Sequence, residues 1–127
     1  MNEKINQLSN SIIGAAIQVH RELGPGLLES AYEACLAFEL GEMGFVVECR
    51  KELPVIYRGI KIDCGYRLDL LVENTIIIEL KTVEKFLPVH EAQLLSYLKL
   101  SNKSLGLLIN FHSTVLKDGI KRIVNQF

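Results

Sequence analysis

The sequence predicts an α/β fold in which helices flank a mixed β-sheet. Three observations predict it: helical periodicity in the first third of the chain, short apolar runs rich in β-branched residues in the middle, and a helical pattern followed by another apolar run near the end. The order is helix, helix, three or four strands, helix, strand, an α-β-β-β-α-β core with helices packed on a central sheet. With 127 residues, the chain is expected to form a single domain over residues 1–127.

Two helices are predicted before Gly44. Apolar residues recur at helical spacing from Ile5 to about Leu23. Gly24-Pro25-Gly26 then ends the helix, because proline cannot continue it and glycine permits a sharp turn. The second helix is expected from about Leu27 to Met43. Its predicted inward residues are Leu28, Ala31, Tyr32, Cys35, Leu36 and Leu40.

The middle of the chain is predicted to be extended, with a turn at residues 58–61. The predicted strands are 45–49, 53–57, 66–72 and 76–81. The last two form the strongest pair and are joined at Glu73-Asn74-Thr75. Ile76-Ile77-Ile78 is β-branched and apolar on both faces, which places this strand in the centre of the sheet.

The last third is predicted to add a helix and a strand. Pro88 is expected to open the helix, which runs to about Leu100, because its missing N–H costs nothing at the first helical position. Residues 105–111 form an apolar strand in the interior of the sheet. Residues 119–124 fit either an edge strand or a short helix.

The net charge of −1 does not mark the chain as a nucleic-acid binder, since such proteins usually carry a basic patch that neutralises phosphates. Positive residues would have to cluster locally. Two runs could do so: Arg50, Lys51, Arg58, Lys61 and Arg67 in the middle, and Lys117, Lys121 and Arg122 near the end. A solvated surface of mixed sign is the simpler explanation for any single one of them.

The cysteines predict a reducing compartment. Cys35, Cys49 and Cys64 are odd in number, widely spaced and free of any CxxC pair, so they indicate neither a zinc site nor a disulfide framework. We expect buried thiols in the cytoplasm. The first residues lack a signal-peptide core, and no apolar run is long enough to span a bilayer, so no membrane partner is expected.

Asp69, Glu79 and Lys81 carry the strongest chemical signal. Asp69 interrupts an apolar strand, where a carboxylate is costly unless it is paired, hydrated or bound to a metal. Glu79 and Lys81 are two residues apart on the next strand and so share a face. Two carboxylates at the end of neighbouring strands suit Mg²⁺ (or Mn²⁺), and a neighbouring lysine can hold and polarise an attacking water. The alternative is a surface Glu–Lys pair with Asp69 hydrogen-bonded to a turn.

The catalytic interpretation depends on the length of the loop between the two strands. A two-residue turn would pair Asp69 with Ile78 and send Glu79 to the opposite face. A three-residue loop pairs Val72 with Ile76 and places Asp69 opposite Glu79. The hypothesis therefore requires an odd loop or a bulge, and Asn74 tolerates the positive φ that such a loop needs.

Two helical segments contribute further candidates. Glu29 falls in the first turn of the second helix, with Tyr32 one turn further on the same side; helix-dipole complementarity and a core aromatic explain them equally well. On the third helix His90, Gln93 and Tyr97 share one side at spacings of three and four, opposite a row of leucines. An amide and a phenol there can bind phosphate oxygens, whereas a lone histidine is more often a surface residue. His20 and His112 have no clear partner.

Gly26-x-x-Glu29-x-x-Tyr32, with the flanking residues 19–26 and 93–99, resembles the GxxExxY proteins, a branch of the PD-(D/E)XK nuclease superfamily. The resemblance runs from about Ile5 to Asn110 and implies a restriction-endonuclease-like fold. It implies that Glu29 is the helical acid, Asp69 the second acid and Glu79-x-Lys81 the signature pair, with the three carboxylates as metal ligands. Gln93-x-x-x-Tyr97 resembles the motif that orients the site and the strand in RecB-type exonucleases. Leu68 stands where the superfamily name has proline.

The leading hypothesis is a Mg²⁺-dependent nuclease that hydrolyses phosphodiester bonds of DNA, in which Tyr32, His90, Gln93 and Tyr97 support the site or contact nucleic acid. The alternative is a catalytically silent module that keeps the fold and binds nucleic acid or a protein partner. The complete acid–acid–acid–lysine set favours the enzyme, and the lack of net positive charge favours the module. Hydrolysis of another phosphoester is a third option. A homodimer would enlarge the substrate surface of so small a chain.

Overall fold

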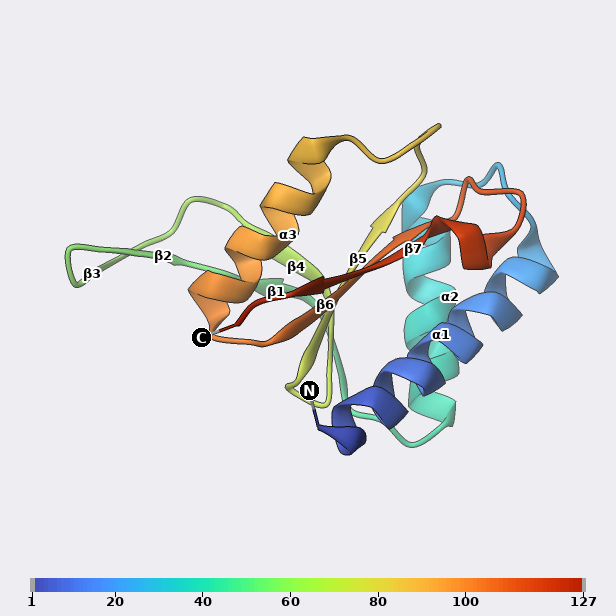
Figure 1. The fold of residues 1–127 in the computed structure, drawn as a ribbon, viewed down its shortest axis with the longest axis horizontal. Helices are drawn as coiled ribbons and strands as arrows, with labels where there is room; N and C mark the ends of the chain where they lie inside the picture. The colour runs from blue at the N-terminus through green and yellow to red at the C-terminus, as the bar shows by residue number, and fades with distance from the viewer. Residues whose placement is uncertain (1, 127) are drawn as a thin grey trace.

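A five-stranded sheet and three helices account for most of the architecture of the computed structural model, which describes residues 2–126 (Figure 1). The helices are α1 (Glu3–Leu23), α2 (Glu29–Glu42) and α3 (Pro88–Ser101), with a 3-10 turn η1 (Leu116–Gly119). The strands are β1 (Val47–Glu52), β2 (Val55–Tyr57), β3 (Ile60–Ile62), β4 (Arg67–Val72), β5 (Ile76–Lys81), β6 (Leu105–Asn110) and β7 (Ile120–Val124).

The sheet has the order β1-β4-β5-β6-β7 and mixes both strand directions. β4 is antiparallel to β1 and to β5, β5 is parallel to β6, and β7 closes the sheet antiparallel to β6. A parallel step needs a crossover, and α3 supplies it. The predicted α/β class with flanking helices is confirmed, and β5 is the central strand as its three isoleucines predict.

The sheet separates two apolar cores. On one face α1 and α2 pack against alternate residues of β4, β5 and β6, with Tyr32 and Phe111 among the largest buried side chains. On the other face α3 covers Leu71, Ile77 and Leu108. Figure 1 shows this three-layer arrangement, with α1 and α2 on one side of the strands and α3 on the other. Hydrophobic burial on both faces explains why the central strands are almost continuously apolar.

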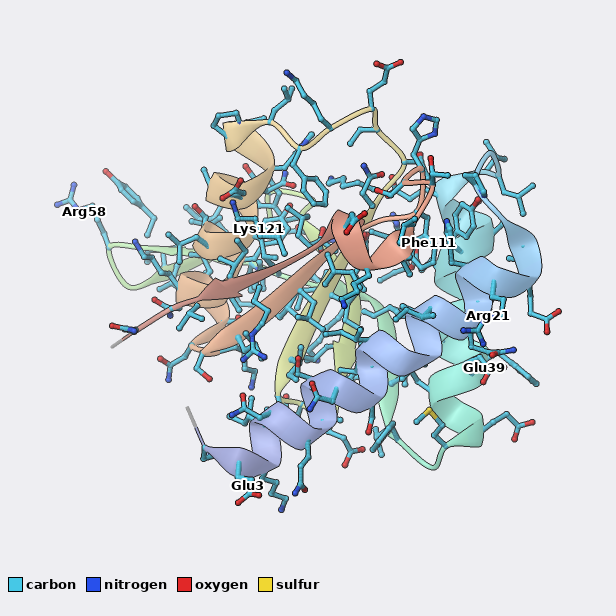
Figure 2. The ribbon with its side chains drawn as sticks, turned by 45° about the vertical axis from the view of Figure 1, so that its right-hand side comes forward. Glu3, Arg21, Glu39, Arg58, Phe111 and Lys121 are labelled. Carbon is cyan, nitrogen blue, oxygen red and sulfur yellow. The ribbon has the colours of Figure 1, made fainter. Side chains whose placement is uncertain are left out.

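The hairpin of β2 and β3 stands apart from the main sheet. Its two strands pair only with each other, and its residues are mostly exposed. Arg58 lies at its tip, pointing away from the rest of the molecule (Figure 2). Of the helices within residues 2–126, none combines the length and the apolar character needed to cross a bilayer.

The helices and strands β4, β5 and β6 lie close to their predicted bounds, and other expectations need correction. The strand predicted at 45–49 is β1 at Val47–Glu52, and β3 (Ile60–Ile62) begins inside the predicted turn 58–61 because it pairs with β2. Residues 119–124 contain the end of η1 and the edge strand β7, so both options apply in part. The three cysteines are exposed, so the prediction of buried thiols is wrong. Leu28 was predicted to point inward but is 78% exposed, because α2 begins only at Glu29 and Leu28 is its N-cap. His20 does have a partner, since its Nε2 lies 2.8 Å from the Ser113 carbonyl oxygen.

Candidate active site

Asp69 and Glu79 lie opposite each other where the regular pairing of β4 and β5 stops. The paired residues run from Val72–Ile76 to Leu70–Ile78, and the next positions along both strands are Asp69 and Glu79. This register uses the three-residue loop 73–75, in which Asn74 has a φ of 50°. The register that the catalytic hypothesis requires is therefore present.

The two carboxylates replace backbone carbonyls as hydrogen-bond acceptors between these strands. Oδ2 of Asp69 accepts the Leu80 amide at 2.9 Å, and Oε2 of Glu79 accepts the Asp69 amide at 2.9 Å. Both side chains are buried, with residue exposures of 7% and 4%. A buried carboxylate needs such donors, because its desolvation is otherwise uncompensated. These two hydrogen bonds hold the two acids side by side at the edge of the core.

The electrostatics of the site identify a carboxylate cluster that Glu29 joins. Burial, and next the charge of Asp69, raise the pKa of Glu79 to about 8. Burial is the main cause that raises the pKa of Asp69, and burial followed by the charge of Asp69 raises that of Glu29. Lys81 lowers the pKa of all three carboxyl groups. The structure thus brings Glu29, Asp69, Glu79 and Lys81 within electrostatic reach of one another.

The raised pKa of Glu79 predicts that stability falls as pH rises. The folded state binds this proton up to about pH 8, whereas the unfolded group releases it near 4.5, so the free energy of unfolding declines between these values and levels off above them. Glu79→Gln keeps an oxygen acceptor for the Asp69 amide and should remove much of this slope. The free energy of unfolding at pH 8 should therefore rise by up to a few kcal/mol. Thermal unfolding of both proteins from pH 5 to 8 in EDTA measures this pH dependence. An unchanged slope in Glu79→Gln would contradict the assignment.

The turn before α2 positions Glu29 at the cluster. Gly24 and Gly26 have φ values of 69° and 108°, which residues with a Cβ rarely adopt. The Tyr32 hydroxyl accepts the Leu27 amide at 3.1 Å and donates to the Gly24 carbonyl. Tyr32 is fully buried and its ring stacks on Phe111 at a centroid distance of 4.5 Å. Tyr32 therefore holds the turn before α2 from inside the core and exposes no surface that could contact a nucleic acid.

Tyr32→Phe is expected to loosen this turn while keeping the stack on Phe111. The Gly24 carbonyl and the Leu27 amide would each lose a partner, which should lower the free energy of unfolding by roughly 1–2 kcal/mol. Tyr57→Phe is the matched control, since Tyr57 is 61% exposed on the β2–β3 hairpin. Chemical denaturation measures both variants. Equal stabilities would show that the hydroxyl does not hold the turn.

The three candidates on α3 differ in their surroundings. Burial, then the charge of Glu79, raises the pKa of Tyr97, which is 7% exposed and lies 5.8 Å from Tyr66 between ring centroids. Tyr97 therefore lies within electrostatic reach of the carboxylate cluster. Gln93 is half-buried one turn earlier and makes no hydrogen bond within residues 2–126. His90 closes the start of α3, where its Nδ1 accepts the Leu87 amide at 3.0 Å.

Two charged residues of the cluster were not singled out from the sequence as site residues. Glu33 lies one turn after Glu29 on α2, and Arg50 lies on β1. Arg50 Nη1 is 3.9 Å from Glu33 Oε2 and 3.9 Å from Asp69 Oδ1. The spacing of four from Glu29 could have indicated Glu33. Arg50 was indicated only as part of a basic run, because its approach to Asp69 depends on strand pairing.

Asn110 is a further buried polar residue beside the site. It pairs with Lys81 across the parallel strands. Its side chain accepts the amides of Val83 and His112 and donates to the Val83 carbonyl at 2.7 Å. These bonds hold the segment that follows Lys81, which suits a residue that positions the end of β5.

The carboxylates match the oxygen ligands that Mg²⁺ and Mn²⁺ prefer. Asp69 and Glu79 each use one oxygen for a backbone amide and keep the other. Burial, followed by the charge of Asp69, raises the pKa of Glu29 and of Glu79, and a bound cation would compensate both effects. As arranged, however, no set of three or more His, Cys, Asp or Glu side chains in the described part of the chain forms a metal cage. The residue types fit a divalent cation, and binding would require the carboxylates to adjust.

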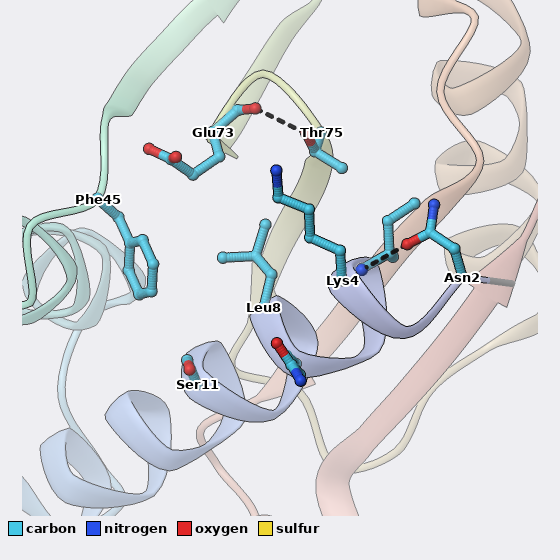
Figure 3. A pocket seen from close by; sticks show the side chains of 9 residues that line it. Asn2, Lys4, Leu8, Ser11, Phe45, Glu73 and Thr75 are labelled. Atoms are coloured by element: carbon cyan, nitrogen blue, oxygen red, sulfur yellow. Dashed lines mark hydrogen bonds between the residues drawn. The ribbon is translucent and has the colours of Figure 1, made fainter.

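A hollow of the surface lies away from these residues. It measures about 550 Å³ and is lined by the start of α1, Phe45 and the loop between β4 and β5. Figure 3 shows Lys4 and Leu8 of α1 facing Phe45, Glu73 and Thr75. This loop is at the end of β4 and β5 opposite to Asp69 and Glu79. The hollow is therefore separate from the carboxylate cluster.

Comparison with protein families agrees with this geometry. Residues 6–123 match the family model of the PD-(D/E)XK nuclease superfamily. No curated protein and no solved structure matches the chain. The match spans nearly the whole sheet and all three helices, including every candidate residue above. The chain therefore belongs to the PD-(D/E)XK nuclease superfamily.

Proposed function

We propose that this protein is a metal-dependent nuclease that hydrolyses phosphodiester bonds of DNA, and that it belongs to the GxxExxY branch of its superfamily. The observation that carries the proposal is the paired placement of Asp69 and Glu79 with Lys81 and Glu29 around them. Membership of a nuclease superfamily over residues 6–123 supports the reaction class. We further propose that the chain works as one cytoplasmic domain, alone or as a homodimer.

In this proposal Asp69, Glu79 and Glu29 hold a Mg²⁺ or Mn²⁺ ion. When bound, the ion would offset the charge of the phosphate and lower the pKa of the attacking water. The amides of Leu80 and Asp69 each hold one carboxylate oxygen, which limits the reorientation that either acid needs when an ion binds. Preorganisation of this kind lowers the cost of reaching the reactive geometry.

The remaining residues act on the water and the substrate. Lys81, two residues after Glu79 on β5, supplies positive charge beside the carboxylates and is proposed to hold the attacking water. Tyr97 faces the cluster from α3 and can donate its hydroxyl to a phosphate oxygen. Gln93 has amide donors that no described residue uses. In this proposal His90 contacts the substrate through Nε2, while its Nδ1 accepts the Leu87 amide at the start of α3.

The alternative function is a catalytically silent module that binds nucleic acid or a protein partner. The net charge of −1 favours it, because a DNA enzyme usually presents a basic surface. The absence of a preformed metal cage within residues 2–126 also agrees with it. Both functions use the same fold, and catalysis distinguishes them.

The test is a cleavage assay on four DNA substrates, linear and circular, single- and double-stranded, with Mg²⁺, Mn²⁺ or EDTA. The nuclease proposal expects cleavage with a metal and none with EDTA, and circular substrates reveal whether free ends are needed. Binding of DNA without cleavage under any metal would support the silent module. Cleavage that continues in EDTA would contradict the proposed metal dependence.

A further inference from the structure

Arg50 occupies an unusual position between two acids of the cluster. The pairs Cys49–Leu70 and Lys51–Leu68 place it directly across from Asp69 on the neighbouring strand. Its φ is 56°, a left-handed conformation that costs about 1–2 kcal/mol for a residue with a Cβ. Such strain persists only where surrounding structure imposes it, and it is often found at functional sites.

The guanidinium of Arg50 contributes little to the stability of the fold. Its side chain is 64% exposed and its two ion pairs are both 3.9 Å long, and exposed pairs of this kind are worth about 0–1 kcal/mol. It donates no hydrogen bond to any residue between 2 and 126. Its N–H donors are therefore held beside the acids by charge alone and remain open to a ligand.

Arg50 and Lys81 flank Asp69 from the two neighbouring strands, because the sheet order is β1-β4-β5. Both positive charges lower the pKa values of Glu29 and Asp69. Arg50 also acts on Glu33, and Lys81 also acts on Glu79. A DNA phosphate that approaches Asp69 meets repulsion unless cations accompany it. An exposed guanidinium suits this role, because its planar fork binds two phosphate oxygens at once.

We propose that Arg50 binds a phosphate group of the DNA substrate and that Glu33 is the positioning residue that holds its guanidinium beside Asp69. The proposal rests on the nuclease function proposed above and assigns the substrate contact of the same site. Glu33 has a residue exposure of 9%, and Arg50 lies within ion-pair distance of it. A buried carboxylate behind an exposed guanidinium directs the remaining donors outward.

The experiment measures equilibrium binding of a fluorescein-labelled DNA duplex and a single strand by anisotropy, at several salt concentrations, with Ca²⁺ replacing Mg²⁺ to limit cleavage. Arg50→Gln should weaken binding about tenfold and reduce the slope of log Kd against log salt by about 1. Arg50→Lys should keep the slope but recover only part of the affinity, because lysine lacks the planar fork.

The matched control is Arg58→Gln, which removes the same charge from another exposed residue with positive φ, at the hairpin tip. It should change affinity at most about twofold. Glu33→Gln should weaken DNA binding a few-fold and raise KM with little change in kcat. The double variant Arg50→Gln/Glu33→Gln should bind no more weakly than Arg50→Gln alone, since Glu33 acts through Arg50. Thermal unfolding of each variant reports the integrity of the fold.

The outcomes separate this inference from the nuclease proposal. If the parent protein binds and cleaves DNA while folded Arg50→Gln has the parent's affinity and salt slope, the assignment of Arg50 is wrong and the nuclease function stands. Equal losses in Arg50→Gln and Arg58→Gln would also overturn it, because they would indicate a general charge effect. A parent protein that binds no DNA would overturn both proposals.

Discussion

Asp69→Asn is expected to abolish metal-dependent cleavage and the stabilisation of the protein by Mg²⁺ or Mn²⁺. Asp69 is one of the two strand carboxylates that the proposal gives to the ion, and its loss halves the anionic charge from the strands. A ligand that binds only the folded state at 100 times its Kd stabilises that state by about 2.7 kcal/mol. The parent protein should show such a metal-induced rise in Tm, and the variant should not.

In EDTA the same substitution should leave the fold intact or make it more stable. Asparagine keeps an oxygen that can accept the Leu80 amide, which Asp69 binds at 2.9 Å. It also removes a buried charge that raises the pKa of both Glu29 and Glu79. This combination of lost function and retained stability is typical of functional sites.

Asp63→Asn is the matched control for this prediction. Asp63 has a side-chain exposure of 59%, lies 3.7 Å from Arg67 Nη1 and accepts the Gly65 amide near the hairpin. Its replacement should leave cleavage and the metal-induced Tm shift at parental values. An Asp69→Asn variant that retains the full Tm shift would exclude Asp69 as a metal ligand.

Lys81→Met is expected to lower kcat by about 10²–10³-fold, the usual cost of removing one charge-stabilising group from an active site. Methionine keeps the apolar stem and removes the charge that acts on Glu29, Asp69 and Glu79. Because lysine does not bind the cation, the metal-induced Tm shift should remain. Single-turnover cleavage rates and thermal unfolding with and without metal measure the two effects.

Lys85→Met tests whether the loss is specific to the site. Lys85 is an exposed lysine in the segment after β5, four residues from Lys81. This variant should cleave at the parental rate. If Lys81→Met also cleaves at the parental rate, Lys81 has no part in the chemistry. If Lys81→Met loses the Tm shift as well, its role is to hold the cluster together.

The catalytically silent module makes the opposite predictions. The purified parent would cleave no DNA with any metal, and its binding of nucleic acid or of a partner would be insensitive to Lys81→Met. Cleavage that continues unchanged in both Asp69→Asn and Lys81→Met would indicate a contaminating nuclease. These variants therefore test the mechanism and the origin of any activity together.

The sequence alone was sufficient for the features that depend on neighbouring residues. The period of two places Glu79 and Lys81 on one face of β5, and the three isoleucines before them predict a central strand, as observed. The odd loop 73–75 was the condition for placing Asp69 opposite Glu79, and the structure has that register. Local periodicity is a property of consecutive residues, so it can be read without knowledge of the packing. The choice between a two-residue and a three-residue loop stayed open in the sequence, and the strand register decided it.

Only the tertiary structure decided which other side chains reach the acids. Arg50 approaches Asp69 because β1 pairs with β4, and Glu33 joins it because α2 packs beside these strands. The same packing turns Cys35 to solvent and buries Tyr32 against Phe111. α2 carries apolar residues on more than one side, so its periodicity does not reveal which side meets the sheet. Contacts between elements far apart in sequence depend on how the layers pack, and the local pattern does not contain that information.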